Sequence, residues 1–172
     1  MVNKGLEIME AHHLFGLPAE RIRAVIHPQS VIHSMVEFED GAVLAQLGNP
    51  DMRGPIGYAM AYPERVSYGA KPLDFAAIGS LTFAVPDLDR FPALGYAVEA
   101  LEAGPWATIV FNGANEAAVA AFLAGNIPFG QIPRIIRGAL DRVSPRAIRS
   151  IGDVYRADAD ARDCANQLIR RL

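Results

Sequence analysis

Between positions 26 and 53, apolar residues can gather on one face of two extended strands while the other face is mixed, which predicts an antiparallel hairpin. At the centre of this stretch, Asp40-Gly41 favours a two-residue type I′ turn, because both central positions of that turn need positive φ. Folding the strands about this turn places Val36 opposite Ala45 on a mostly apolar face and leaves the other face mixed. We therefore expect the apolar face to be covered by core. The other pairs predicted on that face are Phe38 with Val43 and Ser34 with Leu47.

Polar residues gather at the end of the predicted hairpin away from its turn, where they could meet a ligand. His33 is one of them and falls on the mixed face. The four histidines of the chain do not indicate a zinc site, because they show no HxxxH or Cys/His spacing. The polar set comprises His27, Gln29, Ser30, His33, Asn49, Asp51 and Arg53.

A helix is predicted before the hairpin, over 3–15, with Asn3 as its N-cap and Gly16 as its end. Asn3, Lys4 and Glu7 can then point to one side of the first turn. The free N–H groups of a helix N-terminus attract phosphate, and a carboxylate one turn later could hold a divalent metal. The alternative is that Asn3 caps the helix and Lys4 and Glu7 form a solvated ion pair. The residues alone leave both readings open.

The pattern after the hairpin changes from irregular to helical. A short helix beginning near Asp51 is predicted to reach Ala61, and six of the twelve prolines fall between positions 50 and 92, which favours an extended arm. Asn112, Asn115 and Glu116 lie in an alanine-rich helix, where they form either a buried network or an outward face. The helices predicted after Asp89 are 92–103, 106–124, 132–143 and 157–172, and the strand-like runs are 25–27 and 81–85.

These elements predict an α+β fold: a hairpin with helices, followed by a small C-terminal helical bundle. The boundaries that we expect are a first domain over 1–61, a linking arm over 62–87 and a helical domain over 88–172. A chain of 172 residues is long enough for one domain, or two small ones, with a real core.

Composition narrows the class of protein further. The chain is 51% hydrophobic and 20% charged, which indicates a globular protein, and its net charge of −3 does not suggest a nucleic-acid partner. No apolar run approaches the roughly 18 residues that span a bilayer, so we expect no membrane segment. The single Cys164 excludes an intrachain disulfide and fits a reducing compartment. We therefore expect a cytoplasmic location.

Five stretches of the sequence carry a family resemblance that spacing alone does not give. Together they resemble the 1-deoxy-D-xylulose 5-phosphate reductoisomerase family, and the resemblance covers essentially the whole chain. One of them contains the uninterrupted run HPQSVIHSMV. The stretches are Asn3-Lys4-Gly5-Leu6-Glu7, Ile26 to Val36, Leu44 to Arg53, Lys71 to Phe75 and Asn112 to Glu116.

The resemblance implies an enzyme of the non-mevalonate route to isoprenoids. The family rearranges 1-deoxy-D-xylulose 5-phosphate, a phosphorylated sugar, and reduces it to 2-C-methyl-D-erythritol 4-phosphate with NADPH and Mg²⁺ or Mn²⁺. By this resemblance Glu7, Lys4 and His33 are catalytic residues, and Glu7 is one of three carboxylate metal ligands. Asn3 and Lys4 would bind the phosphate and hydroxyl end of the substrate. Met52 would lie near substrate and nicotinamide.

The chain departs from the family pattern ahead of Asn3. The family has a dinucleotide-binding domain and an Asp-Ser-Glu motif there, whereas this chain has no GxGxxG. It therefore resembles the C-terminal half of the enzyme: the end of the catalytic domain, over 1–61, followed by the arm and the C-terminal domain. We expect NADPH to be bound by the complete enzyme and not by this chain alone. A homodimer is also expected, and the alternative function is a catalytically silent structural or dimerisation module.

Overall fold

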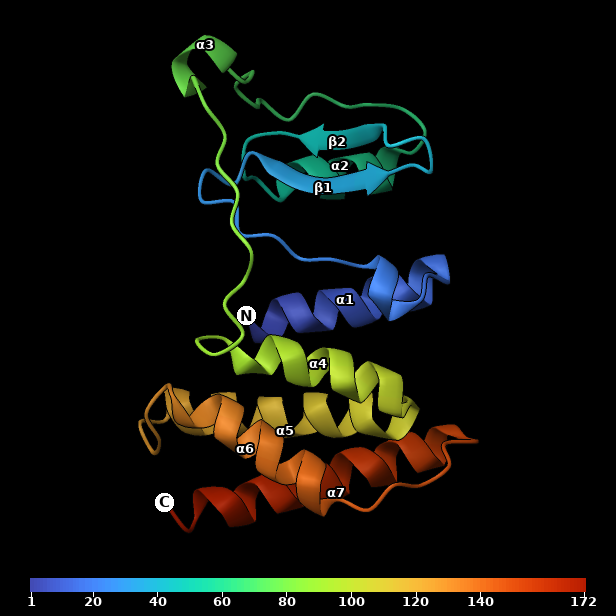
Figure 1. The fold of residues 1–172 in the computed structure, drawn as a ribbon, viewed down its shortest axis with the longest axis vertical. Coiled ribbons are helices and arrows are strands. Elements are labelled where there is room, and N and C mark those ends of the chain that lie inside the picture. Colours follow the sequence, from blue (N-terminus) through green and yellow to red (C-terminus); the bar gives the residue numbers. More distant parts are fainter. The chain divides into compact units, whose positions relative to one another are not determined.

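The computed structural model describes residues 1–172, which form two compact units (Figure 1). The first unit, called the helical unit below, consists of Met1–Ala24 and Pro86–Leu172. The second, called the hairpin unit, consists of Val25–Val85. None of the helices combines the length and the hydrophobicity that are needed to cross a lipid bilayer.

The helical unit is built around α5, which packs against α4, α6 and α7. This arrangement confirms the predicted bundle. Val110, Phe111 and Ile136 are the largest fully buried side chains, and most other core positions of α5 are alanines, which allow close approach of neighbouring helices. The elements of this unit are α1 (Val2–Phe15), η1 (Ala19–Arg21), α4 (Pro92–Ala103), α5 (Pro105–Leu123), α6 (Gln131–Arg142) and α7 (Ile151–Ile169).

The last helix begins at Ile151 and not, as predicted, at Ala157. Ser150 is its N-cap, and Ser150 Oγ accepts the backbone N–H of Asp153 at 3.2 Å. The predicted start was taken from the apolar positions that face the core. These positions do not extend to the first turn, because Ile151 is 72% exposed. The cap therefore sets the start of α7, and burial does not.

The hairpin unit contains β1 (Ile32–Glu37), β2 (Val43–Leu47), α2 (Arg53–Ala61) and α3 (Phe75–Ile78). The two strands pair antiparallel, as predicted, but the predicted register is wrong by one residue. Val36 lies opposite Leu44, and not opposite Ala45, which pairs with Met35. The runs predicted as strands over 25–27 and 81–85 are reduced to a single bridge between Ile26 and Ala84.

The turn explains the register. Only Gly41 in the loop has positive φ, at 83°, so a type I′ turn cannot form. The loop has three residues, and it is closed by a hydrogen bond from the N–H of Phe38 to the carbonyl oxygen of Ala42 at 2.8 Å. Asp40 Oδ1 also accepts the N–H of Ala42 at 2.9 Å, which holds this longer turn in place.

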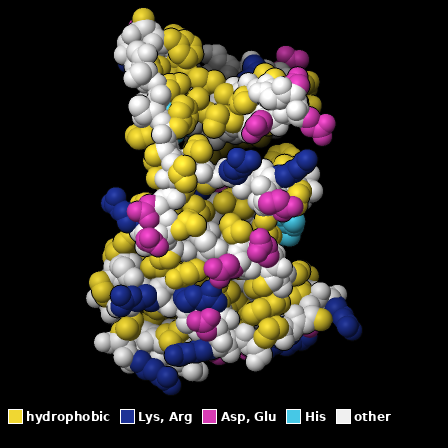
Figure 2. All heavy atoms as spheres, in the orientation of Figure 1, with side chains coloured by type: hydrophobic (Ala, Val, Ile, Leu, Met, Phe, Trp, Pro, Cys, Tyr) yellow, Lys and Arg dark blue, Asp and Glu magenta, His cyan; other side chains and the backbone are white.

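Both faces of the hairpin are exposed, so the expectation that one face is covered by core is wrong for this chain. With the observed register, Val36 and Leu44 share one face and are 57% and 66% exposed. Met35 and Val43 lie on the other face and are 44% and 53% exposed. Figure 2 shows hydrophobic side chains spread over the surface of the hairpin unit.

Helix α1 belongs to the helical unit, where it packs against α4. The expected domain boundaries at 61/62 and 87/88 concern the complete enzyme, and they stay a prediction. Within this chain the hairpin unit ends at Val85, and α1 joins the C-terminal helices. The sequence pattern could not reveal this grouping, because the two parts of the helical unit are separated by the whole hairpin unit.

Candidate functional site

The first turns of α1 hold a cluster of three polar side chains, Asn3, Lys4 and Glu7, called the α1 cluster below. Asn3 Nδ2 donates to Glu7 Oε1 at 2.7 Å, and Lys4 Nζ donates to Glu7 Oε2. The Lys4 and Glu7 side chains are 44% and 42% exposed, so solvent and a ligand can reach them. The three residues therefore point to one side of the helix, as their spacing predicts.

The helix start differs from the prediction in a way that matters for this cluster. Met1 is the N-cap of α1 and makes no side-chain capping bond, so Asn3 is not the cap. Asn3 lies inside the first turn, and its amide binds Glu7 instead of a backbone N–H. The cluster thus sits at the positive end of the helix dipole, close to backbone N–H groups without helical partners, which is a favourable place for an anion.

The donor chemistry of the cluster fits one ligand position of a magnesium or manganese site. Glu7 supplies carboxylate oxygens, which these ions prefer. Asn3 Nδ2 and Lys4 Nζ face Glu7 as donors and cannot act as ligands in this arrangement. No group of three or more His, Cys, Asp or Glu side chains in residues 1–172 is placed to hold a metal. Within the α1 cluster, the carboxylate of Glu7 is therefore the group that could contact such an ion.

Helix α1 lies beside α4 (Figure 1), and the two helices approach each other closely at Gly5. Gly5 is buried, and a Cβ atom on it would lie 2.5 Å from Ala97 Cβ. In a helix interior, alanine is favoured over glycine by about 1 kcal/mol. Overpacking of a core costs about 1–3 kcal/mol. The packing therefore explains why a glycine stands in the first turns of this helix.

The structure places His33 and Met52 in the hairpin unit. His33 Nδ1 lies 3.2 Å from Gln46 Oε1 on the neighbouring strand, and its side chain is exposed. Met52 is the N-cap of α2 and is 70% exposed. Beside it, Arg53 donates a hydrogen bond to Asp51, which lowers the pKa of that carboxyl below its ordinary value.

In the hairpin unit, His27 and Gln29 contact Thr82 and Phe83, which are distant in sequence. His27 Nδ1 lies 2.9 Å from the carbonyl oxygen of Thr82, and Gln29 exchanges hydrogen bonds with the backbone and side chain of Thr82. The His27 ring also stacks on Phe83, with 4.7 Å between the ring centroids. Thr82 and Phe83 were not among the candidate residues. They lie more than 50 residues from their partners, so no local spacing reveals them.

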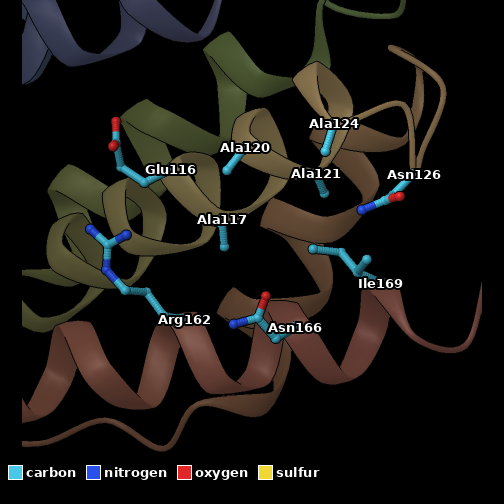
Figure 3. A pocket seen from close by; sticks show the side chains of 9 residues that line it. All are labelled: Glu116, Ala117, Ala120, Ala121, Ala124, Asn126, Arg162, Asn166 and Ile169. Atoms are coloured by element: carbon cyan, nitrogen blue, oxygen red, sulfur yellow. The ribbon is translucent and has the colours of Figure 1, made fainter.

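A hollow of about 440 Å³ lies between α5 and α7, and it contains none of the predicted site residues (Figure 3). Alanines of α5 face Arg162 and Asn166 of α7 across it. Arg162 binds Asp158 at 2.7 Å, which raises the pKa of the guanidinium. Glu116 lines the hollow and is exposed, whereas Asn115 is 8% exposed and its Oδ1 has no partner. Of the three polar residues of this helix, Asn115 is therefore the buried one, whereas Asn112 and Glu116 are both exposed.

Comparison with known proteins gives consistent matches. The family described as DXP reductoisomerase C-terminal domain matches residues 47–164. A 1-deoxy-D-xylulose 5-phosphate reductoisomerase of Burkholderia pseudomallei (strain 668) is 55% identical over 172 residues, which are 100% of this chain and 43% of the relative. The chain thus spans less than half the length of the curated relatives it matches.

Solved structures agree with this similarity along the whole chain. The reductoisomerase from Zymomonas mobilis in complex with NADPH matches with a TM-score of 0.93 and 48% identity, over 100% of this chain and 46% of that one. A DOX-P reductoisomerase in complex with NADPH, fosmidomycin and magnesium matches with a TM-score of 0.93 and 45% identity, over 99% of this chain and 44% of that one. The chain belongs to the 1-deoxy-D-xylulose 5-phosphate reductoisomerase family, of which it contains the C-terminal domain.

Proposed function

We propose that this chain is the C-terminal part of an enzyme that converts 1-deoxy-D-xylulose 5-phosphate into 2-C-methyl-D-erythritol 4-phosphate with NADPH. The observation that carries the proposal is the α1 cluster, in which Asn3 and Lys4 donate to Glu7 at the positive end of a helix. The region that matches this chain is 43% of the Burkholderia pseudomallei relative, so more than half of that protein lies outside it. The rest of the active site, including the NADPH site, would come from that portion.

The α1 cluster would bind the phosphorylated sugar and one metal ion. Lys4 and Asn3 carry N–H donors suited to the phosphate and hydroxyl oxygens of the substrate, and the helix N-terminus favours its negative charge. Glu7 would be one ligand of Mg²⁺ or Mn²⁺. A bound ion of this kind supplies Lewis-acid polarisation of the substrate carbonyl. The solved relatives in complex with magnesium support this assignment.

The hairpin unit would contribute two further contacts. We assign His33 to the substrate side of the site and Met52 to the space near substrate and nicotinamide, and both side chains are exposed in this chain. In the complete enzyme, residues 1–61 would form the C-terminal part of the catalytic domain. Residues 62–87 would form the linking arm, and residues 88–172 would form the C-terminal domain. A cytoplasmic location, proposed from the single Cys164, fits such an enzyme.

A chimera tests the proposed function directly. In this chimera, the matched region of the Burkholderia pseudomallei relative is replaced by this chain, to which it is 55% identical. The part of the relative that precedes the matched region is kept. With Mg²⁺ and 1-deoxy-D-xylulose 5-phosphate, the chimera should oxidise NADPH, measured by absorbance, while this chain alone should not. A folded chimera that binds NADPH but never consumes it would contradict the proposal.

The second candidate function is a silent structural or dimerisation module. Its support is the exposed hairpin, where Val36, Phe38 and Leu44 are 57%, 48% and 66% exposed. Mixing this chain with the separately expressed N-terminal portion of the relative distinguishes the two. Recovery of NADPH oxidation on mixing favours the enzymatic role, and self-association of the chain with no recovery favours the module.

A further inference from the structure

The hydrogen bonds of the α1 cluster do not determine where the cluster lies relative to the other helices. Both bonds to Glu7 run within α1, from residues three and four positions away. They fix the shape of the cluster but not its place relative to other elements. That place depends on how α1 docks on its neighbour α4. One docking contact is made by Gly5, which follows Lys4 in the sequence and approaches Ala97 of α4.

We propose that Gly5 is a positioning residue for the α1 cluster: its missing side chain lets α1 dock on Ala97, and this contact sets where Lys4 and Glu7 stand. The inference rests on the proposed function for its catalytic consequence. Its structural part, the fit of Gly5 against Ala97, stands independently of any activity.

The contact leaves no room for a methyl group on Gly5. A Cβ would meet Ala97 Cβ at 2.5 Å, whereas ordinary van der Waals contacts lie at 3.4–4 Å, so the two helices must separate by about 1 Å. Ala97 is fully buried, and its Cβ is fixed to the α4 backbone and has no rotamer to change. The strain therefore cannot be relieved by a side chain and must displace α1, with Lys4 and Glu7, relative to α4.

Two other close-packed glycines of the helical unit provide a comparison. A Cβ on Gly138 would meet Leu168 Cδ1 at 2.9 Å, but that atom is the end of a flexible side chain. A Cβ on Gly113 would lie 2.8 Å from Asp158 Oδ1 and 3.1 Å from Ala161 Cβ, at the contact between α5 and α7. Gly113→Ala is therefore a control that strains the same unit at a contact between α5 and α7, away from Gly5 and Ala97.

The structural part is tested by a double-mutant cycle on the 172-residue chain. Gly5→Ala should lower the melting temperature by roughly 5 °C through overpacking. Ala97→Gly should also lower it, because it removes a buried methyl group and places glycine in a helix. In the double variant the methyl group of position 5 takes the vacated space, so its melting temperature should lie above that of either single variant. Losses that simply add would overturn the proposed contact.

The positioning part is tested in the chimera, at a temperature where all variants are folded. A displacement of about 1 Å can reduce a catalysed rate on the order of a hundredfold, so Gly5→Ala should lower kcat by about that factor. Adding Ala97→Gly should restore most of the rate, while Gly113→Ala should leave kcat within about twofold despite its own stability loss. Equal losses of kcat in Gly5→Ala and Gly113→Ala would overturn positioning.

Failure of the two proposals can be told apart. If the unmodified chimera has no activity, the proposed function fails while the melting cycle still decides whether Gly5 fits against Ala97. A distance measurement between spin labels then replaces kcat, with one label at Leu14 on α1 and one at Leu123 on α5, both well exposed. Gly5→Ala should lengthen this distance and Ala97→Gly should reverse the change. An unchanged distance would overturn the proposed displacement.

Discussion

Asn3 and Glu7 lie one helical turn apart on α1, and Asn3 Nδ2 donates to Glu7 Oε1 across 2.7 Å. Glu7 accepts a second donor from Lys4, so both of its carboxylate oxygens are engaged. These contacts lie within one helix and are partly exposed, where such pairs stabilise a helix by only a few tenths of a kcal/mol. The cluster therefore matters little for stability, and its effect on function can be tested separately.

Glu7→Gln in the chimera should abolish most of the activity and leave the fold intact. Glutamine has a helix propensity close to that of glutamate, and the lost ion pair is worth little, so the melting temperature should change by less than about 2 °C. The carboxylate that would bind the metal is lost, so NADPH oxidation should fall by at least about a hundredfold.

Glu10→Gln is the matched control for this change. Glu10 lies on the same helix, is exposed, and takes no part in the hydrogen bonds of the α1 cluster. Activity in this variant should stay within about twofold of the unmodified chimera, as expected for a surface substitution. Full turnover of Glu7→Gln at ordinary metal concentration would mean that Glu7 is only a surface charge.

The chain alone should not bind NADPH. It contains no GxGxxG and no strand–loop–helix unit to hold a pyrophosphate, and its two strands form a simple hairpin. Titration of NADPH fluorescence with the chain should show no saturation in the micromolar range. The Zymomonas mobilis reductoisomerase, whose structure holds NADPH, provides the positive control. Saturable micromolar binding by the chain would contradict this prediction.

The helices of the bundle were predictable because their ends carry strong local signals. Pro92 opens α4 and Gly104 ends it, as proline and glycine do at the two ends of many helices. The hairpin was predictable as an element, but its register was not. That register depends on whether Asp40 takes positive φ, and Asp40-Gly41 allows both a two-residue and a three-residue loop.

The candidate site was predictable only in its local part. The spacing of Lys4 and Glu7 places them on one side of a helix whatever the helix packs against. The approach of Gly5 to Ala97 joins positions that are far apart in sequence, and the same holds for His27 and Thr82. Contacts of this kind depend on tertiary packing, which neither periodicity nor motif spacing contains.

Acid should destabilise the start of α7 through Asp153. Hydrogen bonds from Ser150 Oγ, the backbone N–H of Arg149 and the Arg156 guanidinium hold the pKa of this carboxyl well below its usual range. Because the folded pKa lies below the unfolded value of about 3.9, the stabilisation is complete above that value and is lost as the pH falls further.

Melting curves of Asp153→Asn test this sign. The variant should melt below the unmodified chain at about pH 7, and the difference should shrink as the pH is lowered toward about 3. Asp163→Asn, at an exposed carboxyl on the same helix, is the control and should change little at either pH. A difference for Asp153→Asn that is constant with pH would show that its ionisation is not linked to folding.

Self-association through the hairpin is the last prediction. A two-stranded ribbon is marginal alone in water, and this one exposes apolar side chains on both faces with unpaired strand edges. We expect a two-fold dimer, as in most homo-oligomers, which sedimentation equilibrium over a hundredfold concentration range should detect.

The substitution Val36→Lys should weaken this dimer, because the face of the hairpin with Val36 and Leu44 is the more exposed. Met35→Lys, on the opposite face, should have the smaller effect. A monomer at every concentration would rule out the dimer, and a larger effect of Met35→Lys would move the interface to the other face.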